Sequence, residues 1–201
     1  MFELLLITDP GARGGIVASV RAALGGADRR CAVQLRAKAL SPAELLPIAL
    51  ELRALTREAG VALLINGSLE VAQACGADGL HLPEAGLTPA AARTALGPHA
   101  LLGVSCHDPA GLARAADGGA DYATLSPVFD SPNKGPALGI ERFASWTGAA
   151  RLPVFALGGV QAWHAAQLKA AGAHGLAVIS AVFGADDPAA AVRALLNPDR
   201  A

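Results

Sequence analysis

The segment GAHGLAVIS (residues 172–180) decides the fold, because it is the last copy of a pattern that recurs along the chain. Each copy places a short Gly-Ala-Asp or Gly-Ala-His turn before an apolar run that favours a β-strand. The earlier copies are GADRRCAVQL (26–35), GADGLHL (76–82) and GADYATL (119–125). A helical segment leads into every copy, so the chain is predicted to repeat a unit of helix, turn and strand.

Four further apolar runs lie between these copies and bring the number of expected strands to eight. They are LLLITD (4–9), VALLING (61–67), ALLGVSC (100–106) and PVFALGG (153–159). Segments rich in Ala, Leu and Arg separate the strands and are expected to be helices: 14–25, 42–59, 69–75, 89–96, 109–118, 140–149, 161–171 and 187–196. Strands that alternate with helices favour a parallel sheet.

Eight such units in 201 residues predict one domain over residues 1–201, a small closed (β/α)8 TIM barrel of the α/β class. The alternative is an open, doubly wound sheet, which would have a G-x-G-x-x-G fingerprint after its first strand. ITDPGARGG (7–15) is rich in glycine but does not match that fingerprint, so the barrel is favoured.

The composition narrows the classes of partner. Hydrophobic residues make up 53% of the chain, charged residues make up 16%, and the formal net charge is -1, which argues against a nucleic-acid ligand. Cys31, Cys75 and Cys106 show no metal-binding spacing, and reduced thiols fit a cytoplasmic protein. No apolar run approaches the roughly 20 residues that span a bilayer. We expect no membrane partner, and the apolar helices would permit a homodimer.

Small-residue turns follow the last two expected strands. One run closes on Gly158-Gly159, and the next closes on Ile179-Ser180. Such turns expose backbone N–H groups at the beginning of the following helix, where anions bind. In a (β/α)8 barrel this place is a frequent phosphate site. The chain is therefore predicted to handle a small phosphorylated molecule at these four residues.

Polar side chains at the ends of the other strands extend the candidate site. Gln34, Arg36 and Lys38 occupy alternate positions, so they share one face of the strand and are expected to point into the barrel mouth. Asn66 ends the third strand and Ser105 lies near the end of the fifth. Functional side chains of such barrels occupy these carboxyl ends. We expect all five to contact the substrate.

His107 is the best candidate for acid–base chemistry, because histidine titrates near neutral pH and this one follows the fifth strand. The neighbouring Cys106 is expected to face the other side of the strand, which argues against a thiol nucleophile. The loop SPVFDSPNKGPALG (126–139) carries Lys134 and has the character of a loop that closes over a substrate. His81 fits either a packed or a functional residue. His99, His164 and His174 are expected to be structural.

Together these segments resemble the thiamine phosphate synthase/TenI superfamily. The similar segments run in order through almost the whole chain: VQLRAK (33–38), LLING (63–67), GADGLHL (76–82), LLGVSCH (101–107), ADYATLSPVF (120–129), PVFALGGV (153–160) and GAHGLAVIS (172–180). The resemblance implies a (β/α)8 barrel that binds thiazole phosphate on the Gly158-Gly159 turn and the Ile179-Ser180 end.

The superfamily contains two activities, and the resemblance separates them by their metal ligands. Thiamine phosphate synthases join a pyrimidine diphosphate to thiazole phosphate, and they need Mg²⁺ held by an Asp after the third-strand Asn and by another in an H-L-G-Q-x-D stretch. Here Gly67 and Gly86 stand at those two positions, and Ser68 replaces the Arg that usually follows the first Asp. Glu70 and Glu84 are the carboxylates left to compensate, although neither stands at a ligand position.

TenI-type thiazole tautomerases are the closer resemblance, because they lack the metal aspartates and keep a histidine after the fifth strand. The favoured prediction is an isomerase of thiamine biosynthesis that aromatises a carboxythiazole phosphate with His107 as the acid–base residue and without a cofactor. Two alternatives stay open. One is a thiamine phosphate synthase with an altered Mg²⁺ site, in which Gln34, Arg36 and Lys38 hold the diphosphate. The other is a barrel that binds thiazole or thiamine phosphate without catalysis.

Overall fold

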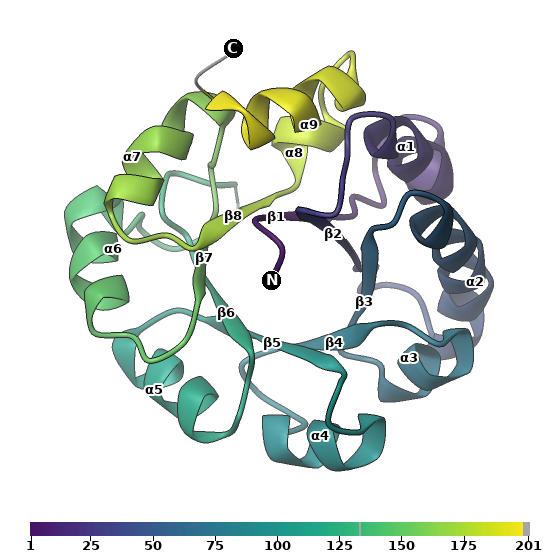
Figure 1. The fold of residues 1–201 in the computed structure, drawn as a ribbon, viewed down its shortest axis with the longest axis horizontal. Coiled ribbons are helices and arrows are strands. Elements are labelled where there is room, and N and C mark those ends of the chain that lie inside the picture. Colours follow the sequence, from purple (N-terminus) through teal and green to yellow (C-terminus); the bar gives the residue numbers. More distant parts are fainter. Residues whose placement is uncertain (133, 199–201) are drawn as a thin grey trace.

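A computed structural model describes residues 1–132 and 134–198 and shows a closed barrel of eight parallel strands surrounded by helices (Figure 1). The predicted fold class is confirmed. Each strand pairs with its neighbours in sequence, and β8 pairs with β1 to close the barrel. The strands are β1 (Leu4–Ile7), β2 (Cys31–Leu35), β3 (Ala62–Asn66), β4 (Gly79–Leu82), β5 (Leu101–Cys106), β6 (Tyr122–Leu125), β7 (Val154–Leu157) and β8 (Gly175–Val178).

The helices fall where the composition places them, and capping side chains of Ser41, Ser68, Thr88, Asp108 and Asp187 mark the beginnings of α2, α3, α4, α5 and α9. They are α1 (Gly15–Leu24), α2 (Pro42–Glu58), α3 (Leu69–Cys75), α4 (Pro89–Leu96), α5 (Pro109–Asp117), α6 (Gly139–Gly148), α7 (Ala165–Ala170), α8 (Ser180–Phe183) and α9 (Pro188–Leu196). The segment expected as one helix over 161–171 instead begins with a 3-10 turn, η1 (Ala162–His164). The four-residue α8 was not predicted, because one turn is too short to show a helical period.

Aromatic side chains fill the N-terminal half of the barrel interior. Phe2, Tyr122 and Phe155 contact one another with ring centroids 4.9–5.3 Å apart, and all three are buried. Figure 1 shows the N-terminus inside the ring of strands. Since Tyr122 opens β6 and Phe2 precedes β1, this plug closes the N-terminal end of the barrel, and the C-terminal mouth is left for a site.

The recurring Gly-Ala-Asp turns have a structural role at that N-terminal end. The Asp78 carboxylate accepts the Leu63 N–H at 2.7 Å and both terminal nitrogens of Arg53. Asp121 likewise accepts the Leu102 N–H at 2.7 Å and pairs with Arg93. Each aspartate thus fastens the beginning of the preceding strand to a helix of the outer ring.

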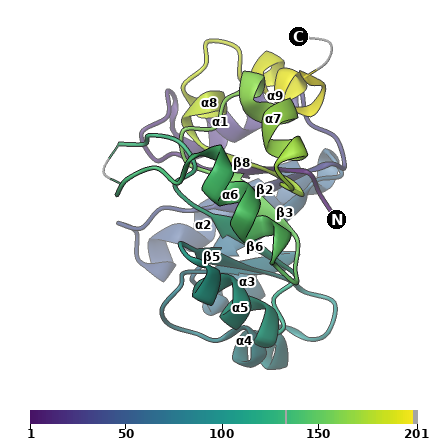
Figure 2. The ribbon, with the colours of Figure 1, turned by 90° about the vertical axis from the view of Figure 1, so that its left-hand side faces the viewer.

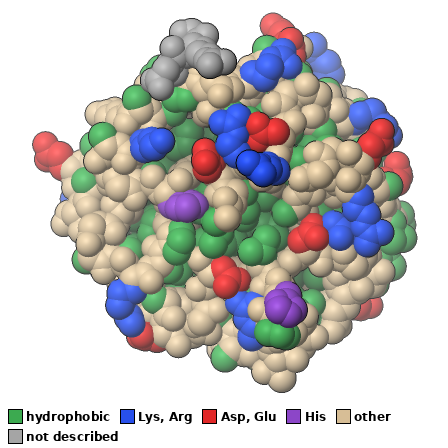
Figure 3. Space-filling view, viewed as in Figure 1, with side chains coloured by type: hydrophobic (Ala, Val, Ile, Leu, Met, Phe, Trp, Pro, Cys, Tyr) green, Lys and Arg blue, Asp and Glu red, His purple; other side chains and the backbone are tan. Residues whose placement is uncertain are grey.

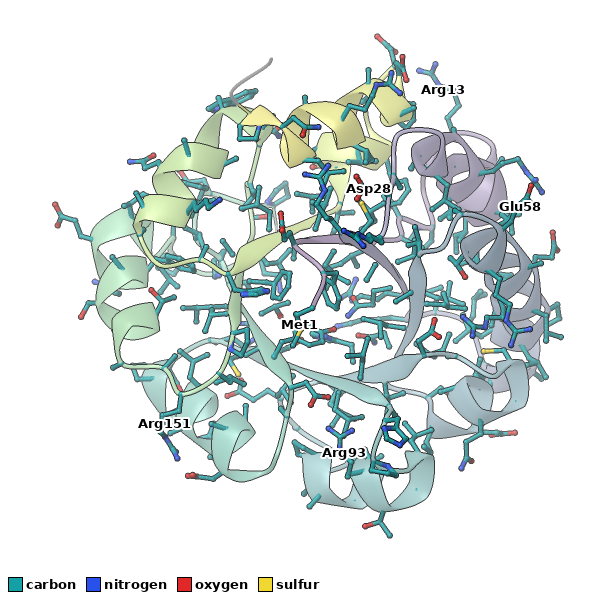
Figure 4. The ribbon with its side chains drawn as sticks, viewed as in Figure 1. Met1, Arg13, Asp28, Glu58, Arg93 and Arg151 are labelled. Carbon is teal, nitrogen blue, oxygen red and sulfur yellow. The ribbon has the colours of Figure 1, made fainter. Side chains whose placement is uncertain are left out.

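The two ends of the barrel differ in what they display. Figure 3 shows charged side chains distributed around a largely apolar centre on the face where the N-terminus lies, and Figure 4 labels Asp28 and Arg93 on it. In Figure 2 the long β6–α6 loop projects from the opposite end. Among the described residues, no helix is long and apolar enough to cross a membrane.

Candidate active site

A cavity of about 720 Å³ opens at the carboxyl ends of the strands, at the end of the barrel from which the β6–α6 loop projects in Figure 2. All the residues that the sequence singled out for a site line this one cavity: Gln34, Arg36, Lys38, Asn66, Ser105, His107, Lys134, Gly158, Gly159, Ile179 and Ser180. The structure therefore brings together residues from the ends of five strands, β2, β3, β5, β7 and β8, and from the β6–α6 loop. Their chemical roles remain predictions.

Side chains within β2 and directly after it bring an unpaired amide and two positive charges to the cavity. Gln34 is 1% exposed, and its Nε2 is buried without a hydrogen-bond partner among the described residues. Arg36 and Lys38 form no ion pair with any described residue. Buried polar groups are usually paired in a protein interior. An unpaired amide and two cations without ion-pair partners in one cavity are therefore well suited to receive an anionic ligand.

Thr8 holds this segment in place, a role that its position at the end of β1 did not reveal. Its Oγ1 accepts the backbone N–H of Arg36 at 2.9 Å and donates to the backbone carbonyl of the same residue at 3.1 Å. Thr8 is 1% exposed, so both bonds are shielded from water. The arginine is thus anchored at its main chain while its side chain reaches the cavity.

His107 reaches the cavity with a fixed tautomer. Its Nδ1 lies 2.7 Å from the backbone carbonyl of Ser126. A carbonyl oxygen only accepts, so Nδ1 carries the proton, and in the neutral ring Nε2 keeps its lone pair. The helix that follows is capped by Asp108, which accepts the Gly111 N–H at 2.6 Å, so His107 is not needed as a cap. The imidazole is therefore available as a general base.

Cys106 is excluded from this chemistry. The side chain is fully buried on the helical side of β5, and burial raises the pKa of its thiol to about 12. A thiol with so high a pKa holds almost no thiolate near neutral pH. The expectation that Cys106 and His107 face opposite sides of the strand agrees with this arrangement.

The Gly158-Gly159 turn lies under the β6–α6 loop. Both glycines have left-handed backbone angles, with φ of 96° and 63°. A Cβ added at Gly158 would lie 2.8 Å from Pro127, and one at Gly159 would lie 2.6 Å from the carbonyl oxygen of Asp130. The sequence suggested that these glycines let a phosphate approach the backbone, and the structure adds a second reason, because they let the loop pack on the turn.

His81 is a buried polar residue at the floor of the cavity. Its Nδ1 lies 3.0 Å from the hydroxyl of Tyr122, and its Nε2 lies 3.0 Å from the hydroxyl of Ser105. Burial, aided by the charge of Arg36, lowers the pKa of His81 to about 3, so the ring is neutral. The sequence left its role open, and it did not mark Tyr122, whose only signal was its place after a Gly-Ala-Asp turn.

The carboxylates that line the mouth, Asp9 and Glu84, belong to no three-ligand cluster of the kind that holds a metal ion among the described residues. Gly67 and Gly86 supply no ligand where the resemblance places them, and Glu70 is exposed in the first turn of α3, outside the cavity. Glu84 lines the cavity but pairs with Arg114 at 2.9 Å. Within residues 1–132 and 134–198, no three His, Cys, Asp or Glu side chains gather as metal ligands would.

The structure defines a TIM barrel with a polar cavity at its mouth, and comparison with known proteins identifies its family. A family model described as "TMP-TENI: Thiamine monophosphate synthase" matches residues 4–182. The chain belongs to this thiamine phosphate synthase/TenI family. It is an enzyme family of thiamine biosynthesis.

Individual relatives carry the name of the synthase. A protein of Methanoculleus marisnigri named "Thiamine-phosphate synthase" is 44% identical over 177 residues, which cover 87% of this chain and 82% of the relative. A Roseiflexus sp. protein of the same name is 40% identical over 195 residues, which cover 94% of this chain and 82% of the relative. These names favour the synthase alternative over the tautomerase that the sequence favoured.

A solved structure supports the same family. "Thiamine phosphate pyrophosphorylase from Pyrococcus furiosus" superposes with a TM-score of 0.87 at 32% identity and covers 98% of this chain and 94% of its own. A sugar-phosphate enzyme, "3-Hexulose-6-Phosphate Synthase", shares the fold with a TM-score of 0.73 at 18% identity. The second likeness concerns the fold alone.

Proposed function

We propose that this protein is an enzyme of thiamine biosynthesis that binds a thiazole phosphate at the barrel mouth and catalyses a metal-independent proton transfer on it. The substrate would be a carboxythiazole phosphate, and the product would be its aromatic tautomer. The observation that carries the proposal is the state of His107, whose Nδ1 is held by the Ser126 carbonyl and whose Nε2 is free to take a proton.

The charges around the cavity support a substrate with two anionic groups. Arg36, Lys38 and Lys134 line it without an ion pair to any described residue. Asp9 and Glu84 also line it, and Glu84 is already paired with Arg114. A phosphate and a carboxylate on one small molecule would match these free cations, and a guanidinium binds either group through two parallel hydrogen bonds.

The phosphate itself fits the neighbouring turns after β7 and β8. The backbone N–H groups of Gly159 and Ser180 donate to no carbonyl among the described residues, and both residues line the cavity. Unpaired N–H groups of this kind form anion-binding concavities. The ring of the substrate would then extend from this end toward β5 and His107.

The reaction needs only a proton to leave one carbon and another to arrive at a second carbon of the same molecule. Nε2 of His107 takes the ring proton, the electron pair left behind completes the aromatic ring, and a proton returns to the exocyclic carbon. Atoms and charge balance without a co-reactant. General acid–base help of this kind contributes roughly a hundred- to ten-thousand-fold in rate.

Thiamine phosphate synthesis is the second candidate, because the relatives quoted above carry that name. The cluster of Gln34, Arg36 and Lys38 favours it as well, since the resemblance assigns those residues to a diphosphate. The residues at the two ligand positions, Gly67 and Gly86, speak against it.

Two assays on one preparation decide between these candidates. The first follows conversion of the carboxythiazole phosphate tautomer by absorbance with EDTA present. The second follows pyrophosphate release by ³¹P NMR from pyrimidine diphosphate and thiazole phosphate, with Mg²⁺ or with EDTA. Conversion that EDTA does not affect supports the proposal. Metal-dependent release of pyrophosphate overturns it in favour of the synthase, and binding of thiazole phosphate with neither reaction indicates a binding protein.

A further inference from the structure

A chain of hydrogen bonds runs from the barrel interior to the cavity wall. It begins at the Tyr122 hydroxyl, passes through the two ring nitrogens of His81 at 3.0 Å each, and ends at the Ser105 hydroxyl. Tyr122 is 0% exposed and His81 is 2% exposed, whereas Ser105 lines the cavity. The reaction proposed above uses none of the three.

The direction of the first bond follows from burial. Burial raises the pKa of Tyr122 far above its ordinary value, so the phenol keeps its proton. His81 Nδ1 is the hydrogen-bond partner that the described residues offer it. If Nδ1 were the donor, the buried phenol proton would have no acceptor, which costs about 1–3 kcal/mol. Tyr122 therefore donates, and Nδ1 accepts.

The second bond then follows from the first. A neutral imidazole carries one proton, so His81 with an accepting Nδ1 carries it on Nε2. Nε2 donates to the Ser105 oxygen, and the Ser105 proton is left to point into the cavity. This polarity is opposite to that of a Ser-His-Asp triad, in which histidine takes the serine proton. Ser105 is therefore a donor and not a nucleophile.

We propose that Tyr122 and His81 are positioning residues that fix Ser105 as a hydrogen-bond donor to an anionic oxygen of the substrate. The proposal rests on the proposed function insofar as the cavity is the substrate site. The oxygen belongs either to the phosphate or to the carboxylate, and the two sources share the chemistry of a charged acceptor.

The surroundings of Tyr122 are shaped to hold this chain. A Cβ added at Gly103 would lie 2.1 Å from the Tyr122 ring, so the glycine of the LLGVSCH segment makes room for the phenol. Phe2 and Phe155 contact the same ring with centroids 5.2 and 5.3 Å away in edge-on geometry. Packing on these sides holds the ring with its hydroxyl oxygen 3.0 Å from His81 Nδ1.

The tautomer of His81 can be read directly in the wild-type protein. Histidine labelled with ¹⁵N should give a neutral ring with its proton on Nε2, and this state should persist from pH 7 to pH 5. A proton on Nδ1 or a charged ring would overturn the inference, whatever the activity. Thr124→Val is the matched control, because it removes a buried hydroxyl two residues along β6 that has no partner among the described residues. It should leave the His81 signals unchanged.

Binding measurements test the consequence for the ligand. Ser105→Ala should weaken binding about tenfold, the size of one hydrogen bond to a charged group. If Ser105→Ala lowers the affinity for both thiazole phosphate and carboxythiazole phosphate, the phosphate accepts the hydrogen bond from Ser105. If it lowers the affinity for carboxythiazole phosphate alone, the carboxylate accepts that bond. Tyr122→Phe should weaken binding to a smaller extent, since it frees His81 to exchange tautomers and turn its proton away from Ser105.

The double variant separates positioning from packing. Tyr122→Phe should cost nothing further once Ser105 is alanine, because its effect passes through that hydroxyl. Full additivity would overturn the inference. Should Tyr122→Phe fail to fold, the ¹⁵N spectrum of the wild-type protein still decides it. Binding of neither compound by the wild-type protein would refute the proposed function, whereas a proton on Nδ1 would refute the inference even with full turnover.

Discussion

The two ends of this barrel handle charge in opposite ways. At the N-terminal end, Asp78 and Asp121 are each satisfied by an arginine and by a backbone N–H. At the mouth, Arg36 and Lys38 have no ion-pair partner among the described residues, and Nε2 of Gln34 is buried unpaired. At the N-terminal end these charges pair with one another and hold the strands together, although Nε of Arg53 is also buried without a partner among the described residues. The other end is incomplete, and a bound anion would complete it.

The largest expected effect is on turnover, and it distinguishes His107 at the mouth from His99 at the N-terminal end. His107→Gln should lower the turnover of carboxythiazole phosphate by about a hundred- to ten-thousand-fold, because glutamine cannot take a proton. His99→Gln is the control, since His99 is exposed and lines a pocket with Asp78 at the N-terminal end, away from the mouth. Single-turnover rates and unfolding curves of both variants check the contrast. Equal turnover in the two variants would remove His107 from the mechanism.

The second prediction concerns the bonds that Asp78 forms at the N-terminal end. Asp78→Ala leaves the Leu63 N–H and Arg53 without their acceptor, so the free energy of unfolding should fall by about 1–3 kcal/mol. Thermal unfolding should move down by about 2–4 °C for each kcal/mol. The comparison is Asp117→Ala, which removes the ion pair with Arg151. Both of these side chains are exposed, so the pair contributes at most about 1 kcal/mol to the free energy of unfolding. The affinity for thiazole phosphate should be unchanged in both variants. If Asp78→Ala alone lowered that affinity, ligand binding at the mouth would depend on the N-terminal end, and the contrast between the two ends would fail.

The third prediction concerns the turn after β7. Gly159→Ala forces a Cβ to within 2.6 Å of the Asp130 carbonyl at a left-handed φ of 63°. The turn must move, and binding of thiazole phosphate should weaken about tenfold, which corresponds to about 1.4 kcal/mol. Gly148→Ala serves as the control, because nothing lies near its Cβ and its φ is not left-handed. Unchanged affinity in Gly159→Ala would place the phosphate elsewhere.

The sequence predicted the features that repeat or that end a strand. Four Gly-Ala-Asp/His turns and four other apolar runs located all eight strands, because buried parallel strands are nearly continuous apolar segments. The alternation of Gln34, Arg36 and Lys38 placed three residues on the cavity wall. Strand order then brought Ser105, His107 and the two small-residue turns to the same end.

The residues that hold the site could not be predicted in this way. Thr8, Ser126 and Tyr122 act through hydrogen bonds to residues at least 19 positions away in the chain. A hydrogen bond between residues so far apart leaves no pattern in the local sequence. In Ser126 the acceptor is the backbone carbonyl, and because every residue has one, the residue type does not reveal it. The reversed polarity of the His81–Ser105 bond likewise follows only from the burial of Tyr122, a property of the closed barrel.

The smallest expected effect has opposite signs for stability and for binding. Gln34→Met replaces a side chain of similar length and removes the buried Nε2 that lacks a partner, so the free energy of unfolding should rise by about 1 kcal/mol. Binding of thiazole phosphate or carboxythiazole phosphate should weaken, because methionine lacks the Nε2 amide group that would donate a hydrogen bond to the ligand. Gln73→Met is the matched control, since that exposed amide already donates to the Ala95 carbonyl at 3.1 Å and should bring no gain in stability. Chemical denaturation measures the free energy of unfolding, and calorimetric titration measures the affinity.

If Gln34→Met raises the free energy of unfolding and lowers the affinity, then Gln34 contributes to ligand binding at a cost to the stability of the fold. A loss of stability in Gln34→Met would mean that the amide already has a partner, and the contrast between the two ends would fail there.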